Sequence, residues 1–184
     1  MKFTISLVAL GVLFLQYASG KRIDAVATMK SSNGVSGEFN FSARTAGHPP
    51  VNLQMEISGI KEDEYYTYHI HEKAVPRNGS CKDTGDHLDP LAVNKKDGKY
   101  SCKPSRLLKT CELGDLAGIY GNATRNSKSK DTYKKSVVLN YLIMDNGSLS
   151  EADAKFNVLG RSIVIHDKSN NRIACGNITI QDSS

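Results

Sequence analysis

The sequence feature that most constrains the fold is a repeated alternation of apolar and polar residues with a period of two. The run VNLQMEISGI, for example, has apolar side chains at every second position, namely Val51, Leu53, Met55 and Ile57. Successive side chains of a β-strand point to opposite faces, so this pattern predicts a strand with one buried face. Similar runs lie near residues 23–30, 34–42, 65–71, 136–143, 161–167 and 172–180. Short strands at this spacing predict an all-β fold, an antiparallel sandwich or barrel.

Residues 1–20, MKFTISLVALGVLFLQYASG, have the layout of a secretory signal peptide, with an early lysine, an apolar run near residues 7–15 and a small-residue end. The apolar run is too short to span a bilayer, whose hydrocarbon core is roughly 30 Å thick. We therefore expect residues 21–184 to form a single secreted, extracellular domain. The chain ends IQDSS, without an apolar tail or an ER-retention signal, so no membrane anchor is expected.

The charge gives no sign of a nucleic-acid partner. The formal net charge of +5 is small and is dispersed over 24 basic and 19 acidic residues. The local basic run RNSKSKDTYKK, residues 125–135, is interpreted as a solvated loop. No apolar surface signature of a dimer is visible either, so a monomer is expected.

Cysteines and glycosylation sequons fit the secretory route. The cysteines all follow the signal peptide and allow two disulfides in three possible connectivities; they are Cys81, Cys102, Cys111 and Cys175. Candidate glycosylation sites are Asn40, Asn78, Asn122, Asn146 and Asn177. Asn40 and Asn177 lie inside strand-like runs and are therefore the weaker candidates.

Two histidines stand one residue apart in the strand-like run YTYHIHEKAV. On a strand His69 and His71 project to the same side, where they could form half of a transition-metal site. The polar segment from Glu72 to about Asp115 begins directly after them and contains three of the four cysteines. A loop of this length is uncommon in a compact domain unless it is functional or disordered, and we interpret it as ordered and functional.

The other histidines lie in distinctive motifs, His87 in CKDTGDHLDP and His166 in GRSIVIHDKSNNRIACG. Taken in order, the motifs YHIHEK, CKDTGDHLDP, CELGDLAG and GRSIVIHD…NRIACGNI resemble those of the copper/zinc superoxide dismutase family. The resemblance implies a Greek-key antiparallel β-barrel or sandwich of immunoglobulin type, with one long loop pinned by a disulfide. His48, in AGHPPVN, matches none of the motifs and is expected in a surface turn.

The resemblance also implies the residues of a copper site. Copper would be held by His69, His71, His87 and His166, and His87 would double as a proton relay. Arg172 would draw in and orient the anionic substrate. Cys81 and Cys175 would form the family's disulfide, which leaves Cys102 and Cys111 to pair with each other.

The chain departs from the zinc-bearing members of the family in two places. Between His87 and Asp115 there is no second histidine, so a zinc site of the usual ligands cannot be completed. Glu112 stands where those members have a zinc histidine, as in the copper-only branch. We expect Glu112 to accept a hydrogen bond from the far nitrogen of His87, with Asp115 in support. The second departure lies between His166 and Arg172, where the zinc-bearing members have a long electrostatic loop and this chain has only DKSNN. The copper is therefore expected to be more open to solvent.

With these departures, the resemblance implies a copper-dependent superoxide dismutase without zinc, which converts superoxide to O₂ and hydrogen peroxide. One alternative is a catalytically inactive copper-binding module of the same fold, although a store or carrier has no need of Arg172. A second alternative is an adhesive β-sandwich with incidental histidines, against which stands the match of four of the five histidines to ligand positions.

Overall fold

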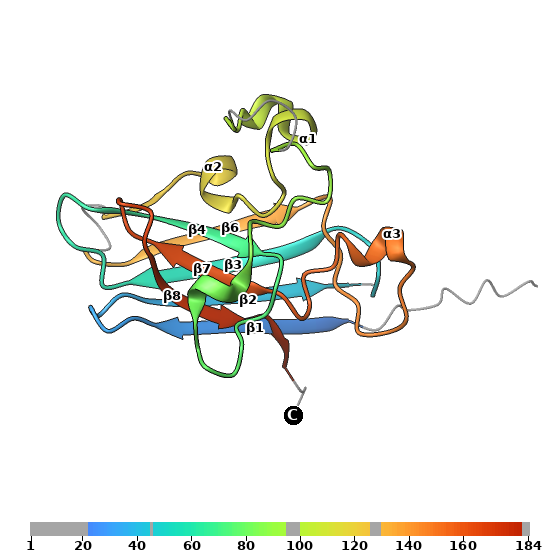
Figure 1. Ribbon diagram of the computed structural model, residues 1–184, viewed down its shortest axis with the longest axis horizontal. Helices are drawn as coiled ribbons and strands as arrows, with labels where there is room; N and C mark the ends of the chain where they lie inside the picture. Colours follow the sequence, from blue (N-terminus) through green and yellow to red (C-terminus); the bar gives the residue numbers. More distant parts are fainter. Residues whose placement is uncertain (1–21, 45, 95–99, 126–129, 182–184) are drawn as a thin grey trace, which may run out of the picture.

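A computed structural model of the chain describes residues 22–44, 46–94, 100–125 and 130–181. In these ranges, two antiparallel sheets face each other (Figure 1). One apolar core lies between them. The larger sheet has the order β6 (Tyr133–Leu139), β3 (Val51–Ser58), β2 (Ser36–Ala43), β1 (Ile23–Lys30) and β9 (Thr179–Ile180). The smaller sheet has the order β5 (Ala123–Thr124), β4 (Tyr65–His71), β7 (Ser162–His166) and β8 (Arg172–Asn177). The predicted all-β architecture is thereby confirmed.

The period-two alternation sorts side chains as expected. Along β3 the residues Val51, Leu53, Met55 and Ile57 are buried, while their neighbours are at least partly exposed. The strand β7 differs, because all five of its residues are buried. Ile163 and Ile165 belong to the apolar core between the sheets, so the other face of β7 must be covered by something else.

The covering segment is the long connection between β4 and β5, which contains short helical turns and no strand among its described residues. They are η1 (Cys81–Thr84), η2 (Pro104–Arg106), α1 (Leu107–Thr110) and α2 (Leu116–Tyr120), and α2 packs against β4 (Figure 1). Disulfides join Cys81 to Cys175 of β8 and Cys102 to Cys111, the two expected pairs. The segment is therefore pinned to the smaller sheet and closed on itself.

One predicted strand is shifted toward the N-terminus. β6 begins at Tyr133, inside the run 125–135 interpreted as a loop, so residues 133–135 belong to a strand, while residues 126–129 lie outside the described residues. The run near residues 136–143 was predicted as a strand from its apolar residues, but β6 ends at Leu139. Leu142, Ile143 and Met144 are buried in the irregular connection that leads to α3 (Glu151–Ala154). They are buried without joining a sheet. A short apolar run of this kind cannot be distinguished from a buried strand by its composition alone.

The predicted run 172–180 is divided between the two sheets. It breaks at Ile178, whose backbone N–H donates to Arg161 O, and β9 then pairs with β1 of the larger sheet. Among the residues that the structure describes, no helix has the length and apolarity needed to cross a membrane. The predicted signal peptide, residues 1–20, lies outside the described residues.

Candidate metal centre

Four histidines meet on the outer face of the smaller sheet, between β4, β7 and the segment that covers them. Each offers a ring nitrogen, and these nitrogens lie within 4.8 Å of one another; the residues are His69, His71, His87 and His166. Three of them are buried, whereas the side chain of His87 is 24% exposed. The structure thus brings together the four predicted ligands, and it leaves His48 exposed and outside the group.

The strand register explains how three of the histidines converge. In β4, Tyr68 and Ile70 belong to the core, so His69 and His71 project to the opposite face. The paired strand β7 ends at His166, where a register irregularity follows Ile165. Such an irregularity re-aims a side chain at a strand end.

A closed set of three backbone hydrogen bonds brings the remaining segments to β4. Ile70 N–H donates to Gly114 O (2.9 Å), Gly114 N–H to Leu88 O (2.8 Å) and Leu88 N–H to Ile70 O (2.9 Å). We call Ile70, Leu88 and Gly114 the backbone ring. Ile70 stands between two histidines and Leu88 follows His87, so this arrangement fixes three histidines relative to one another.

Each histidine has one ring nitrogen near a protein oxygen. His71 Nδ1 donates to Gly85 O (3.0 Å) and His166 Nδ1 to Asn170 O (3.4 Å), since a carbonyl can only accept. His87 Nδ1 lies 2.5 Å from Glu112 Oε2, and His69 Nε2 lies 3.4 Å from Asp115 Oδ1. With the proton on these nitrogens, the other nitrogen of every ring carries a lone pair toward its neighbours.

Two observations show that the group suits a metal ion. His71 Nε2 and His166 Nε2 are 3.4 Å apart, and two lone pairs at that distance repel unless a cation or proton lies between them. His69 Nδ1 is buried and has no hydrogen-bond partner among the described atoms. Imidazole suits copper, zinc, iron and nickel, so a set of four nitrogens fits copper.

Burial also keeps the buried rings neutral. It lowers the pKa of His71 to about 2 and that of His166 to about 4, and it lowers the pKa of His69 as well. The charges of neighbouring histidines act in the same direction. Neutral imidazole is the form that binds a metal, so the rings are competent ligands at neutral pH.

The two predicted carboxylates are both at the site, but they contact different histidines. Glu112 is 2% exposed and contacts His87, as expected. Asp115 does not act through Glu112 but lies against His69, because α2 begins there and Asp115 caps it by accepting from Gly118 N–H. Burial alone would raise the pKa of Asp115, but hydrogen bonds from His69, Tyr100 and Gly118 outweigh burial and lower the pKa to about 2.

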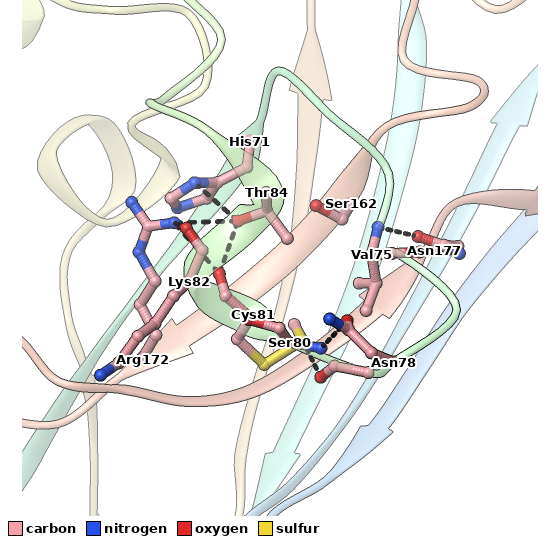
Figure 2. Close-up of a disulfide and its surroundings, with 12 residues drawn as sticks. His71, Val75, Asn78, Ser80, Cys81, Lys82, Thr84, Ser162, Arg172 and Asn177 are labelled. Atoms are coloured by element: carbon pink, nitrogen blue, oxygen red, sulfur yellow. Dashed lines mark hydrogen bonds between the residues drawn. A yellow bond between two sulfur atoms is a disulfide. The ribbon is translucent and has the colours of Figure 1, made fainter.

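Arg172 opens β8 and reaches the turn that precedes His87. Its Nη1 donates to the carbonyls of Cys81 and Lys82 and to Thr84 Oγ1, and its Nη2 donates to Gly85 O (2.8 Å). Gly85 O also accepts from His71 Nδ1, and Figure 2 shows Thr84 between Arg172 and His71. The Arg172 guanidinium and the candidate ligand His71 therefore donate to the same carbonyl oxygen. The guanidinium lies beside the Cys81–Cys175 disulfide, since it also donates to Cys81 O.

The candidate glycosylation sites divide by accessibility. Asn78, Asn122 and Asn146 are exposed in loops or turns. Asn40 is partly buried within β2 and donates to Glu38. Asn177 is engaged through its side-chain oxygen, which accepts from Val75 N–H (2.6 Å), as Figure 2 shows.

The fold and the site together define a class of antiparallel β-proteins that hold a transition metal with buried histidines. A model of the copper/zinc superoxide dismutase family matches residues 35–178, and the chain belongs to that family.

The chain is similar to cell-surface superoxide dismutases of two fungi. The chain is 31% identical over 158 residues to cell surface superoxide dismutase Cu-Zn 4 of Candida albicans, covering 85% of this chain and 60% of the relative. It is 35% identical over 113 residues to a cell surface Cu-only superoxide dismutase of Arthroderma benhamiae, covering 61% of this chain and 27% of the relative. The chain thus spans less than two thirds of the length of either relative.

Solved structures also match. Candida albicans superoxide dismutase 5 with Cu(II) superposes with a TM-score of 0.65 at 28% identity, covering 89% of this chain and 95% of that one. Structures of variants of the same enzyme, with a glutamate or an aspartate three positions later replaced, match with TM-scores of 0.67 and 0.62.

Proposed function

We propose that the chain is a copper-dependent superoxide dismutase that converts superoxide to O₂ and hydrogen peroxide at the four-histidine group. The observation that carries the proposal is the orientation of the rings, each with one nitrogen near a protein oxygen and the other turned toward a shared space. Membership of the superoxide dismutase family supports the same reaction. Copper, when bound there, supplies the reversible one-electron chemistry that the reaction needs.

His87 is the residue best suited to move a proton. Its side chain is the most exposed of the four, so it faces incoming superoxide and water, whereas the other three rings are buried. Its Nδ1 is fixed by Glu112, which orients the ring and leaves Nε2 to bind the metal or carry a proton. We assign His69, His71 and His166 the role of permanent ligands and His87 that of ligand and proton relay.

Arg172 attracts and orients the substrate. Its nitrogens are held by carbonyl and hydroxyl oxygens, and in the described part of the chain it forms no ion pair with a carboxylate. Its charge is therefore uncompensated by a neighbouring anion and draws a small anion toward the histidines. The turn of residues 81–85 holds this charge in place.

We propose further that the site works with copper alone. No second histidine lies between His87 and Asp115, and the nitrogen of His87 that a second metal would need is hydrogen-bonded to Glu112. Relatives named Cu-only support this proposal. The solved Candida variants concern a glutamate and an aspartate with the same spacing as Glu112 and Asp115.

We also propose that the mature protein starts at Lys21, is exported, and acts outside the cell as a monomer. The signal-peptide layout of residues 1–20, two disulfides and the cell-surface names of relatives support export. The substrate would then be superoxide that arises outside the cell.

The test is to load residues 21–184 with copper and with zinc separately, and to measure metal content and superoxide disproportionation on the same samples. We expect one copper per chain, no tightly bound zinc, and activity that is abolished in His87→Ala. The matched control is His48→Ala, which removes an exposed histidine outside the group. Stoichiometric copper without activity would favour the inactive binding module, and tight stoichiometric zinc would contradict the copper-only proposal.

A further inference from the structure

The two carboxyl groups beside the histidines are buried, so each of their oxygens needs a partner. Glu112 is 2% exposed and Asp115 is 6% exposed. An unpaired oxygen at such depth carries a desolvation penalty and leaves the group free to rotate. The hydrogen-bond partners of these two carboxyl groups therefore decide whether the carboxylates can orient His87 and His69.

The second oxygen of each carboxyl group is held by a residue that the sequence motifs do not include. Glu112 Oε2 contacts His87, and its Oε1 accepts from Asn94 Nδ2 at 2.6 Å. Asp115 Oδ1 accepts from Gly118 N–H and faces His69, and its Oδ2 accepts from the Tyr100 hydroxyl at 2.7 Å. In both carboxyl groups one oxygen faces a histidine, and the other accepts a hydrogen bond from Asn94 or Tyr100.

Tyr100 acts on both carboxylate-bearing residues. Its hydroxyl donates to Asp115 and at the same time accepts from the backbone N–H of Glu112 at 3.1 Å. Burial and the hydrogen bond to Asp115 raise the pKa of Tyr100, so the phenol stays protonated and keeps donating. One hydroxyl thus links the side chain of Asp115 to the main chain of Glu112.

Covalent and local bonds hold Asn94 and Tyr100 in place. The Cys102–Cys111 disulfide joins the stretch just after Tyr100 to the residue just before Glu112. The Asp89 side chain accepts from the backbone N–H groups of Val93 and Asn94, which fixes the turn that carries Asn94. Both residues are therefore presented to the carboxylates by an ordered framework.

We propose that Tyr100 and Asn94 are positioning residues of the metal centre, which orient the carboxylates of Asp115 and Glu112 toward His69 and His87. The proposal rests on the proposed copper site. Without the Tyr100 hydroxyl, Asp115 loses the partner of one oxygen and turns away from His69 and from Gly118. Without the Asn94 amide, Glu112 loosens its hold on His87.

The first test uses the metal-free chain and the variant Tyr100→Phe, which keeps the ring and removes the hydroxyl. Backbone amide hydrogen exchange is followed at Glu112 and at Gly118. We expect faster exchange at Glu112, which loses its own acceptor, and also at Gly118, whose acceptor Asp115 is no longer fixed. Unchanged exchange at Gly118 would overturn the positioning role, since a purely local loss would affect Glu112 alone.

The second test measures Cu(II) affinity by chelator competition and the Cu(II) electron paramagnetic resonance spectrum. Outer partners of ligating histidines commonly contribute about 10–100-fold in metal affinity. We expect Tyr100→Phe and Asn94→Ala each to weaken copper binding roughly tenfold, near the lower end of that range, and to alter the spectrum. Affinity and spectrum identical to those of the unmodified chain would overturn the proposal.

The control is Tyr120→Phe, which removes a hydroxyl that donates to Val138 O, away from the histidines. We expect its copper affinity, spectrum and exchange at Gly118 to match those of the unmodified chain. If the unmodified chain binds copper but does not disproportionate superoxide, the proposed activity fails while these measurements still decide the roles of Tyr100 and Asn94. If the unmodified chain binds no copper, both proposals fail.

Discussion

At the scale of single residues, Arg172 combines a fixed position with a charge that has no ion-pair partner among the described residues. We expect Arg172→Ala to lower kcat/KM for superoxide by about 10–100-fold at equal copper content, because the site loses both attraction and orientation of the anion. The kcat/KM of Arg172→Lys should lie between those of the unmodified chain and of Arg172→Ala. An ammonium keeps the charge, but it lacks the planar fork of donors that reaches several acceptors at once. The measurement is the rate at several ionic strengths.

The salt dependence separates steering from structure. Exposed charges are screened within about 8 Å at physiological salt, so the rate of the unmodified chain should fall as salt rises, and that of Arg172→Ala should fall less. Arg44→Ala removes an equal charge from an exposed position outside the site and serves as the control. Equal salt dependence in all three proteins would remove the steering role of Arg172.

The sequence could predict the candidate ligands because their motifs are local and distinctive. It could not predict Tyr100 or Asn94, since neither has a neighbouring pattern that indicates a partner. Their roles depend on where a long loop folds back. The predicted Cys102–Cys111 pair brings the stretch near Tyr100 close to Glu112, but it does not identify the atoms that the Tyr100 hydroxyl contacts. For the same reason Asp115 was assigned to Glu112, whereas the cap of α2 turns it to His69.

At the scale of elements, the backbone ring depends on a glycine. A Cβ atom at Gly114 would lie 2.4 Å from Ile70 O and 2.7 Å from Leu88 N, which are both backbone atoms that cannot move aside cheaply. We expect Gly114→Ala to lower the free energy of unfolding by about 1–3 kcal/mol, as overpacking does, and to weaken copper binding because His87 shifts relative to β4. Denaturant unfolding and chelator competition measure the two effects.

Gly147→Ala is the matched control, because its added Cβ meets only the flexible side chain of Asp145, at 3.1 Å. Its stability and copper affinity should stay close to those of the unmodified chain. A Gly114→Ala protein with unchanged copper affinity would show that the backbone ring does not set the ligand geometry.

The elements themselves were predicted well where alternation is regular. β1, β3 and β4 lie where the pattern placed them, because one face of each strand packs on the core. The strand predicted near residues 136–143 was wrong at its C-terminal end, since β6 ends at Leu139 and the buried Leu142 and Ile143 lie in the loop that follows. Burial is common to both arrangements, and only pairing with another strand distinguishes them.

At the scale of the whole molecule, a metal bound only by the folded chain stabilises it. At free copper about 1,000-fold above Kd, the gain is about 4 kcal/mol. For a domain of this size that corresponds to a rise in Tm of roughly 8–16 °C. Calorimetry with and without copper measures the shift, and addition of a chelator should reverse it.

His166→Ala provides the control for this shift, because it removes a ligand candidate from β7 and should reduce the copper-dependent rise. An equal rise in that variant would mean that copper stabilises the chain elsewhere. The same scans on the Tyr100→Phe protein connect the whole-molecule measurement to the local proposal.

The separation of the four histidines along the chain sets an order of events during biogenesis. Three of them lie within residues 69–87, whereas the fourth, His166, is supplied by β7 much later in the chain. Sites built from nearby ligands can nucleate folding, as in zinc fingers, but this one is complete only after β7 has paired with β4 in the smaller sheet. Copper would therefore find its full ligand set only after the smaller sheet has formed, so the metal is expected to complete the site late rather than to nucleate folding.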